Sequence, residues 1–138
     1  MSVLVLDSEA FSRLARSRSG HPPGAVHAAL MAAAERGADV VVPAAVLAEQ
    51  YRGGPHDQVV DACLGRYSGI DVADTTRGLA RTIGNLLARA DRDSTDHVDA
   101  SVVAVALAAG GGVIATGDPD DLGALAAGLP GLSVESIS

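Results

Sequence analysis

Val3-Leu4-Val5-Leu6-Asp7 is an unbroken apolar run closed by an acid, and it indicates the kind of fold to expect. A short continuous apolar run is typical of a strand that is buried on both faces of a parallel sheet. A second such run, Val113-Ile114-Ala115-Thr116, is followed closely by Asp118. Because ligands of open parallel sheets bind at the carboxyl ends of the strands, we expect Asp7 and Asp118 at a functional edge.

Apolar runs of strand length alternate with longer helical patterns along the rest of the chain. Further strands are expected at 39–42, 70–73 and 132–135, with helices at about 8–16, 25–36, 57–66, 75–90, 96–109 and 119–127 and one that begins at Pro43. Ser8, Thr75, and Ser94 or Thr95 are the expected helix caps or openings. Strands separated by helices predict an α/β fold, a single domain over 1–138 with a parallel β-sheet flanked by α-helices on both faces.

The composition fits such a domain. The 138 residues suffice for one hydrophobic core, and 48% of them are hydrophobic. No apolar run is long enough to cross a bilayer, and the first residues become acidic at Asp7 instead of forming a signal peptide. We therefore expect a soluble, cytoplasmic protein without a membrane partner. The single Cys63 is expected to be a small buried hydrophobic residue.

The net charge of −7, with ten Arg and no Lys, weakens a nucleic-acid hypothesis, because nucleic-acid binders usually carry a basic surface. Bound divalent ions shared by the acids would offset part of this negative charge. Arg13, Arg16 and Arg18 form a local basic cluster. Such a cluster is most often an exposed face, and the alternative is that it grips RNA phosphates.

Four acids at the ends of apolar segments, Asp7, Glu49, Asp99 and Asp118, indicate a metal site. Carboxylates gathered beside apolar surface are costly to desolvate and raise one another's pKa unless a cation neutralises them. Hard oxygen donors without His or Cys partners favour Mg²⁺ or Mn²⁺. Asp7 and Asp99 are the firmest expected ligands, Asp118 a ligand or an anchor, and Glu49 a ligand or a base that orients water. Ser8 and Thr116 are candidate hydroxyl partners.

Each acid also has a structural interpretation. Asp7 and Asp118 can be helix N-caps, and Glu49 can be solvated on a short helix. Asp99 is hardest to explain as a surface residue, because its helix is apolar nearly all round. A second set of acids fits a cap or first-turn role favoured by the helix dipole, with a supplementary role in the site open to them: Asp96, Asp120 and Asp121.

Four segments follow one another in a recognisable order and spacing over nearly the whole chain. They are Val5-Leu6-Asp7-Ser8, Pro43 to Gly53 with Leu47-Ala48-Glu49, Asp96-His97-Val98-Asp99-Ala100, and Thr116-Gly117-Asp118-Pro119-Asp120-Asp121-Leu122. Together they resemble PIN-domain ribonucleases, in particular the VapC-like toxins of bacterial toxin-antitoxin modules. The resemblance maps the family's carboxylate quartet onto Asp7, Glu49, Asp99 and Asp118. It implies Mg²⁺- or Mn²⁺-dependent cleavage of single-stranded RNA, a homodimer, and a small antitoxin partner that covers the site.

The residue chemistry agrees with that implication, since a divalent ion can activate water and stabilise a leaving oxygen without a covalent nucleophile. No convincing Ser-His-Asp or Cys-His arrangement is present in the sequence. Two alternatives remain open. One is a non-catalytic PIN-like module that binds RNA or protein, against which the crowded acids argue. The other is an aspartate-based metal-dependent phosphatase, from whose usual Asp-x-Asp pattern Asp7-Ser8-Glu9 departs.

Overall fold

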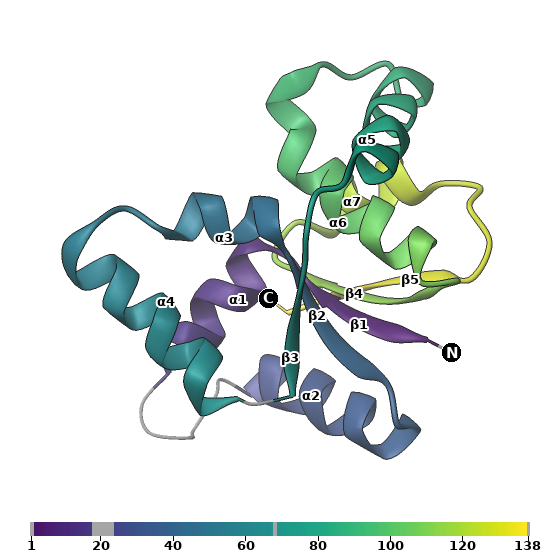
Figure 1. Cartoon of the computed structure of the whole chain (residues 1–138). Helices are drawn as coiled ribbons and strands as arrows, with labels where there is room; N and C mark the ends of the chain where they lie inside the picture. The colour runs from purple at the N-terminus through teal and green to yellow at the C-terminus, as the bar shows by residue number, and fades with distance from the viewer. Residues whose placement is uncertain (1, 18–23, 68, 138) are drawn as a thin grey trace.

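The computed structural model describes residues 2–17, 24–67 and 69–137, and within them five strands form one sheet (Figure 1). All neighbouring strands are parallel, and their order is β3-β2-β1-β4-β5. The strands are β1 (Val3–Leu6), β2 (Asp39–Pro43), β3 (Ile70–Ala73), β4 (Gly112–Thr116) and β5 (Leu132–Ser136). Each expected strand is present to within one residue, so the predicted parallel sheet is confirmed.

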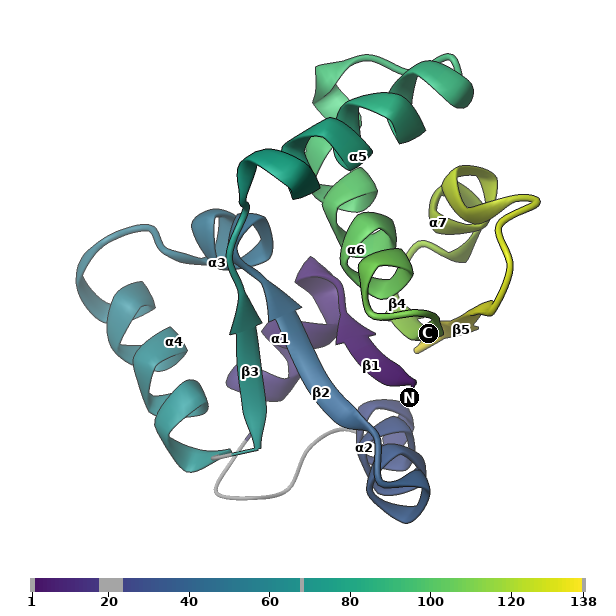
Figure 2. The ribbon, with the colours of Figure 1, turned by 45° about the vertical axis from the view of Figure 1, so that its right-hand side comes forward.

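Helices cover both faces of this sheet, as predicted. They are α1 (Ser8–Ala15), α2 (Gly24–Arg36), α3 (Ala44–Gln50), α4 (Gly54–Arg66), α5 (Arg77–Arg89), α6 (His97–Ala108) and α7 (Pro119–Ala126). Figures 1 and 2 show α1 and α2 on one face and α6 and α7 on the other. Helix α4 packs on α1 and α3, and α5 packs along α6. Within the described residues, no helix combines the length and apolarity that crossing a bilayer requires.

The core is built on β1, whose four residues are all buried between β2 and β4. Helix α6 is buried at every position from 100 to 106, which explains its lack of a polar face. Helix α5 also contributes to the core, because its residues Ile83, Leu86 and Leu87 are buried. Cys63 is a free and fully buried thiol, as expected. Burial of these apolar side chains is the main favourable contribution to folding.

The caps expected at Ser8 and Thr75 are each off by one residue, whereas the alternative interpretation of Asp7 as a helix N-cap is confirmed. Asp7, not Ser8, caps α1, and its carboxylate accepts a hydrogen bond of 2.8 Å from the amide of Ala10. Thr76, not Thr75, caps α5 through its hydroxyl, which accepts from the amide of Leu79. In both helices the cap is the residue whose side chain reaches the amide three positions later. The position of the first cap matters because Asp7 is also one of the four acids predicted to form a metal site.

The start of two other helices also differs from the prediction. Helix α4 begins at Gly54, three residues early, because Pro55 fits its first turn. The expected helix 96–109 is preceded by a 3-10 turn, Ser94–Asp96, which Asp93 caps by accepting from the amide of Thr95. Neither Ser94 nor Thr95 is therefore the cap. The regular α6 then begins at His97, which places the carboxylate of Asp99 in its first turn.

Strands β1 and β4 can approach closely because the first residue of β4 is Gly112, which has no side chain. A Cβ atom at Gly112 would collide with the backbone of Val3, so another residue cannot pair there without moving the strand. The pairing sets Leu6 opposite Ala115, and the amide of Asp7 donates a 3.1 Å hydrogen bond to the carbonyl of Ala115. The carboxyl ends of the two strands consequently lie side by side.

Candidate metal centre

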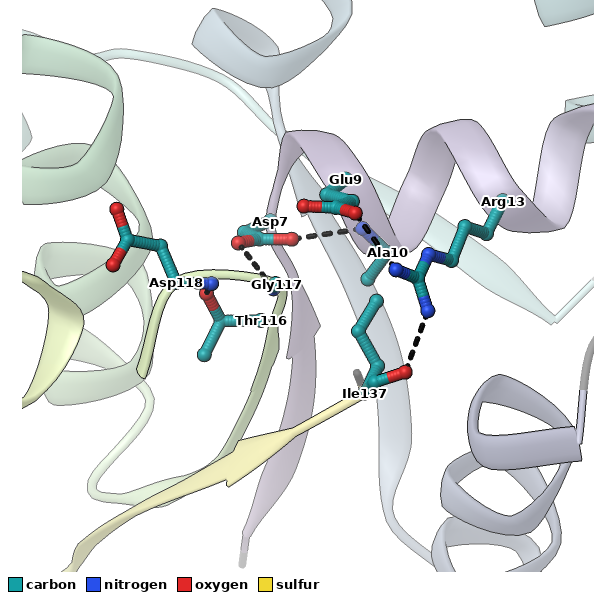
Figure 3. A network of polar contacts seen from close by, with 8 residues as sticks. All are labelled: Asp7, Glu9, Ala10, Arg13, Thr116, Gly117, Asp118 and Ile137. Carbon is teal, nitrogen blue, oxygen red and sulfur yellow. Dashed lines mark hydrogen bonds and ion pairs between the residues drawn. The ribbon is translucent and has the colours of Figure 1, made fainter. Parts of the chain in front are cut away.

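The turn that follows β4 wraps around the carboxylate of Asp7. The amide of Gly117 donates to Asp7 Oδ2 at 3.3 Å, while the amide of Ala10 donates to Oδ1 (Figure 3). The hydroxyl of Thr116 is a further hydrogen-bond partner of Asp7. Both oxygens of Asp7 are thus held by groups from two different parts of the chain. The predicted hydroxyl partnership of Thr116 is confirmed.

Asp7 is a buried acid, with only 5% of its surface exposed. Burial raises its pKa above the ordinary value, because the charged form loses its hydration. Hydrogen bonds from Ala10, Thr116 and Gly117 oppose this shift without cancelling it, and the nearby charge of Glu9 adds to it. Asp7 is therefore a helix cap and at the same time a carboxylate that a cation would stabilise.

Three further carboxylates converge beside Asp7. Asp99 comes from the first turn of α6, Asp118 is the N-cap of α7, and Asp121 lies in the first turn of α7. One oxygen from each lies within 4.8 Å of the others. These are hard oxygen donors of the kind that Mg²⁺ and Mn²⁺ prefer. Two of the four predicted site acids, Asp99 and Asp118, are thus brought together directly.

The crowding of negative charge is most evident at Asp99. Burial and the charges of the neighbouring acids together raise its pKa to about 6, with burial the largest cause, followed by the charges of Asp7, Asp118, Asp121 and Asp96. Because the charge of Asp7 raises the pKa of Asp99, the buried Asp7 lies close enough to the three converging carboxylates to interact with them electrostatically. Such a raised pKa is typical of a functional site, and a divalent ion would relieve the repulsion.

Asp118 and Asp121 interact with each other as well. The amide of Asp121 donates to Asp118 Oδ1 at 3.4 Å, and the amide of Asp118 donates to the hydroxyl of Thr116 at 2.8 Å. A side-chain hydrogen bond with Asp121 raises the pKa of Asp118. The pKa of Asp121 is lowered instead, first by its hydrogen bond with Arg92 and then by Asp118. Asp118 is accordingly a helix cap, like Asp7, and a member of the group of three carboxylates.

Glu49 stands at the margin of this centre. It lies exposed near the end of α3, where its carboxylate accepts a hydrogen bond from the hydroxyl of Ser8. The side chain of Gln50 donates to the carbonyl of Ser8 at 3.1 Å, which ties α3 to the residue next to Asp7. Glu49 also lines a pocket of about 440 Å³ together with His97 at the start of α6. Like Asp7, it is outside the group of three carboxylates whose oxygens lie within 4.8 Å.

Two residues at the acidic centre, Asp121 and Arg92, are not among the four acids that the sequence predicts for it. Asp121 was expected mainly as a first-turn acid that the helix dipole favours, and the structure brings it into the carboxylate group. Its signal was the spacing from Asp118, since a cap and the residue three positions later face each other. Arg92 was not identified, although its spacing of four residues from Asp96 permits the ion pair that the structure contains.

In the predicted basic cluster, Arg13 is engaged in contacts within the fold. Arg13 pairs with Glu9 at 2.8 Å and donates to the backbone carbonyl of Ile137 at 2.6 Å (Figure 3). It is therefore engaged in holding the fold together. Arg16 is exposed, and Arg18 lies outside the described residues.

The fold and its acidic centre define an α/β protein with clustered carboxylates at the carboxyl edge of a parallel sheet. Residues 4–127 match the sequence profile of the PIN domain, and the chain belongs to that family. The resemblance found in the sequence is thereby confirmed. No curated protein sequence matches the chain significantly.

Solved structures with the same fold include three toxin-antitoxin complexes. A chain of VapBC2 from Rickettsia felis, bound to a DNA fragment from the promoter, has a TM-score of 0.69 and 15% identity, over 97% of this chain and 98% of that one. A chain of DNA-bound VapBC from Salmonella typhimurium has a TM-score of 0.67 and 16% identity, with complete coverage of both. A toxin-antitoxin complex from Klebsiella pneumoniae gives 0.63 and 17%, with 95% coverage of each. At these identities the likeness concerns the fold.

Proposed function

We propose that this protein is a Mg²⁺- or Mn²⁺-dependent endoribonuclease that cleaves single-stranded RNA and acts as the toxin of a toxin-antitoxin pair. One observation carries the proposal: the carboxylates of Asp99, Asp118 and Asp121 lie within 4.8 Å of one another, and the pKa of Asp99 is raised to about 6. Uncompensated acids of this kind destabilise a fold, so a cation is the simplest reason for their presence.

The donor set fits a hard divalent ion. The ion would be held by Asp99, Asp118 and Asp121 together with the buried Asp7. Glu49 contacts Ser8 at the start of α1, so it would act from the edge of the centre. Clustered carboxylate oxygens favour Mg²⁺ or Mn²⁺ over Zn²⁺, which prefers nitrogen and sulfur ligands. When bound, such an ion supplies a Lewis acid that activates water and stabilises the oxygen leaving a phosphodiester.

The side chains of the chain itself have distinct tasks in this proposal. Asp7 is rigid, because the amides of Ala10 and Gly117 fix both of its oxygens. Asp99 is ionised at neutral pH, since its pKa of about 6 lies below 7. Glu49 is exposed and oriented by Ser8, so we assign it the role of accepting the proton of the attacking water. These tasks require no covalent intermediate.

The two alternatives are less well supported. An aspartate nucleophile needs a free, accessible oxygen, whereas Asp7 is 5% exposed and each of its oxygens accepts from a backbone amide. A non-catalytic module would contain acids that repel one another, with no bound ion to compensate their charge. The toxin assignment is supported by the family and by fold neighbours that are toxin-antitoxin complexes. The homodimer and the single domain over 1–138 stay predictions from the sequence.

The test is a cleavage assay with purified protein and single-stranded RNA in Mg²⁺, in Mn²⁺ and in EDTA. We expect cleavage with either ion, none in EDTA, and loss of activity in Asp7→Asn and Asp99→Asn. Asp71→Asn is the matched control, because Asp71 is an exposed acid on β3 away from the centre. Cleavage in EDTA, or equal activity in Asp99→Asn and Asp71→Asn, would contradict the proposal. DNA and small phosphate esters in the same assay define the substrate class.

The proposed role as the toxin of a toxin-antitoxin pair requires a separate experiment. The chain should be co-expressed with the product of the adjacent upstream gene, and we expect a small protein that co-purifies and blocks cleavage. A basic side chain suits the entry to an acidic centre, so high salt and high Mn²⁺ should weaken inhibition. A chain that cleaves RNA but binds no such partner would be a free-standing nuclease. Light scattering checks the dimer.

A further inference from the structure

The pocket that Glu49 shares with His97 lies at the carboxyl edge of the sheet and has a volume of about 440 Å³. Helix α3 contributes three alanines and Glu49 to its lining, and the start of α6 contributes His97 and Val98. Thr75, two residues after the end of β3, completes the lining. The volume lies within the range of sites that hold small ligands. The chemistry proposed for the acidic centre leaves this pocket without a role.

The pocket and the acidic centre occupy neighbouring positions along one edge of the sheet. The strand order β3-β2-β1-β4 places the ends of β2 and β3 next to those of β1 and β4. Asp7 and Asp118 follow β1 and β4, whereas α3 follows β2 and Thr75 follows β3 (Figure 2). Glu49 joins the two sites, because it lines the pocket and its carboxylate accepts a hydrogen bond from Ser8, the residue after Asp7. A substrate bound at the centre can therefore extend into the pocket.

The lining favours a neutral group over a phosphate. Among the residues that line the pocket, all of which the structure describes, Glu49 is the one acid and no arginine is present. A phosphate would meet the negative charge of Glu49 and of the nearby centre with no cation to offset it. The small side chains of Ala44, Ala45 and Ala48 instead offer apolar surface that a flat group can approach closely. The pocket thus fits a neutral, flat ring.

His97 supplies a ring on which such a group can stack. Of the described residues that line the pocket, His97 alone carries a ring, and it is exposed at the start of α6. The single Phe and the two Tyr of the chain do not line the pocket. Unpaired RNA bases stack on the rings of Phe, Tyr, Trp and His side chains. The pocket consequently has both the shape and the chemistry to bind a nucleobase.

We propose that this pocket is a nucleobase subsite, in which the base of a nucleotide next to the cleaved phosphodiester stacks on His97. The inference rests on the proposed function, because it takes single-stranded RNA as the substrate. An unpaired base can turn out of its strand into the pocket, whereas a base in a duplex is held by its partner. The subsite accordingly makes cleavage depend on an unpaired base beside the acidic centre. His97 binds the substrate in this role and takes no part in proton transfer.

The test removes the base and the ring separately and together, in single-turnover cleavage with Mn²⁺ of RNA oligonucleotides that each lack one base. For the wild type, we expect loss of the base next to the cleaved bond to raise the half-saturating RNA concentration about tenfold, the size of one base–ring stack. His97→Ala should raise it similarly for intact RNA, and loss of the base should then add little. His97→Phe should restore most of the lost affinity. His27→Ala is the matched control, because His27 is exposed on α2.

Fluorescence tests the same contact without cleavage. The chain has no tryptophan, so His97→Trp introduces a single reporter ring into the pocket. We combine it with Asp99→Asn, which should leave the RNA intact, and expect intact RNA to quench the emission much more than RNA without the adjacent base. Ala48→Leu fills the pocket from an exposed position of α3 and should weaken the quenching. Circular dichroism checks that each variant is folded.

Three results would overturn the inference alone, with the wild type still cleaving RNA. The first is equal cleavage of every oligonucleotide, whichever base is missing. The second is independence of the ring and the base, so that His97→Ala and loss of the base together raise the half-saturating concentration about a hundredfold. The third is equal quenching by intact and by abasic RNA. A wild type that cleaves no RNA with either ion overturns the proposed function and this inference with it, so the two failures are distinguishable.

Discussion

Arg13 Nη1 lies 2.6 Å from the carbonyl oxygen of Ile137, which joins the first helix to the far end of the described chain. The amide of Ile137 in turn donates to the carbonyl of Thr116 at 2.9 Å. Thr116 bonds Asp7 and Asp118 through its hydroxyl, so Arg13 supports the turn that closes over the acidic centre (Figure 3). A residue first considered as a possible contact to RNA thus has a structural task.

Replacing Arg13 should therefore destabilise the protein. Arg13→Ala removes the bond to Ile137 and the pair with Glu9, and we expect the free energy of unfolding to fall by about 1–2 kcal/mol. Urea denaturation monitored by circular dichroism measures this. Arg81→Ala on the exposed side of α5 should change it by less than about 0.5 kcal/mol. Equal effects of the two substitutions would show that the bond to Ile137 contributes nothing.

The raised pKa of Asp99 predicts a pH dependence of the metal-free protein. Its pKa is about 6 in the folded state, against the ordinary value of 3.8. The folded state therefore holds the proton more tightly, so the contribution of Asp99 to stability is fully present below pH 3.8 and is lost as the pH rises through 6. At pH 7 without metal, Asp99→Asn should be more stable than the wild type by about 2 kcal/mol, after allowing for solvent screening.

Thermal denaturation in EDTA between pH 4 and pH 8 checks this. The gap between Asp99→Asn and the wild type should close toward pH 4 and reverse when millimolar Mn²⁺ is added, since an ion that binds only the folded site raises its stability. A wild type that is more stable than Asp99→Asn at pH 7 in EDTA would contradict the assigned pKa.

Gly112 should tolerate no side chain. A Cβ atom there would collide with the backbone of Val3, so Gly112→Ala is expected to cost more than about 2 kcal/mol and to impair the pairing of β1 with β4. Gly84→Ala is the control, because nothing lies within 4 Å of a Cβ at that position in α5. The control should be neutral or slightly stabilising, as Ala favours helix over Gly. Chemical denaturation of both variants distinguishes a local clash from a general effect of losing glycine.

Glu49 offers a way to separate proton transfer from ion binding. Glu49→Gln should lower the rate of RNA cleavage by about 100-fold or more, because it removes the proposed base. Its affinity for Mn²⁺ should fall much less than that of Asp99→Asn, since Glu49 lies outside the group of three carboxylates. Single-turnover cleavage and calorimetry on the same samples measure the two effects. A loss of Mn²⁺ affinity equal to that of Asp99→Asn would make Glu49 a ligand instead.

The sequence predicted most of the fold because the buried strands are unbroken apolar runs. Val3–Leu6 and the run before Asp118 are examples, and their order with the helices sets the topology. The acids at strand ends were found because carboxylates beside apolar residues are conspicuous. Caps were missed by one residue, since Ser8 and Asp7 both have cap chemistry and geometry alone distinguishes them. The spacing of Arg92 from Asp96 permits an ion pair, but its link to the carboxylate group was missed because Asp121 is distant in sequence.

The closing of the turn over Asp7 has a consequence for the order of events during synthesis. The amide of Gly117 that binds Asp7 comes from 110 residues further along the chain. Strand β1 must wait for β4, and long-range parallel pairing is slow to form. While the ribosome is still adding residues, Asp7 has its local partner Ala10 but not yet Gly117. The acidic centre can therefore be complete only after the residues that follow β4 have been synthesised and have paired with β1.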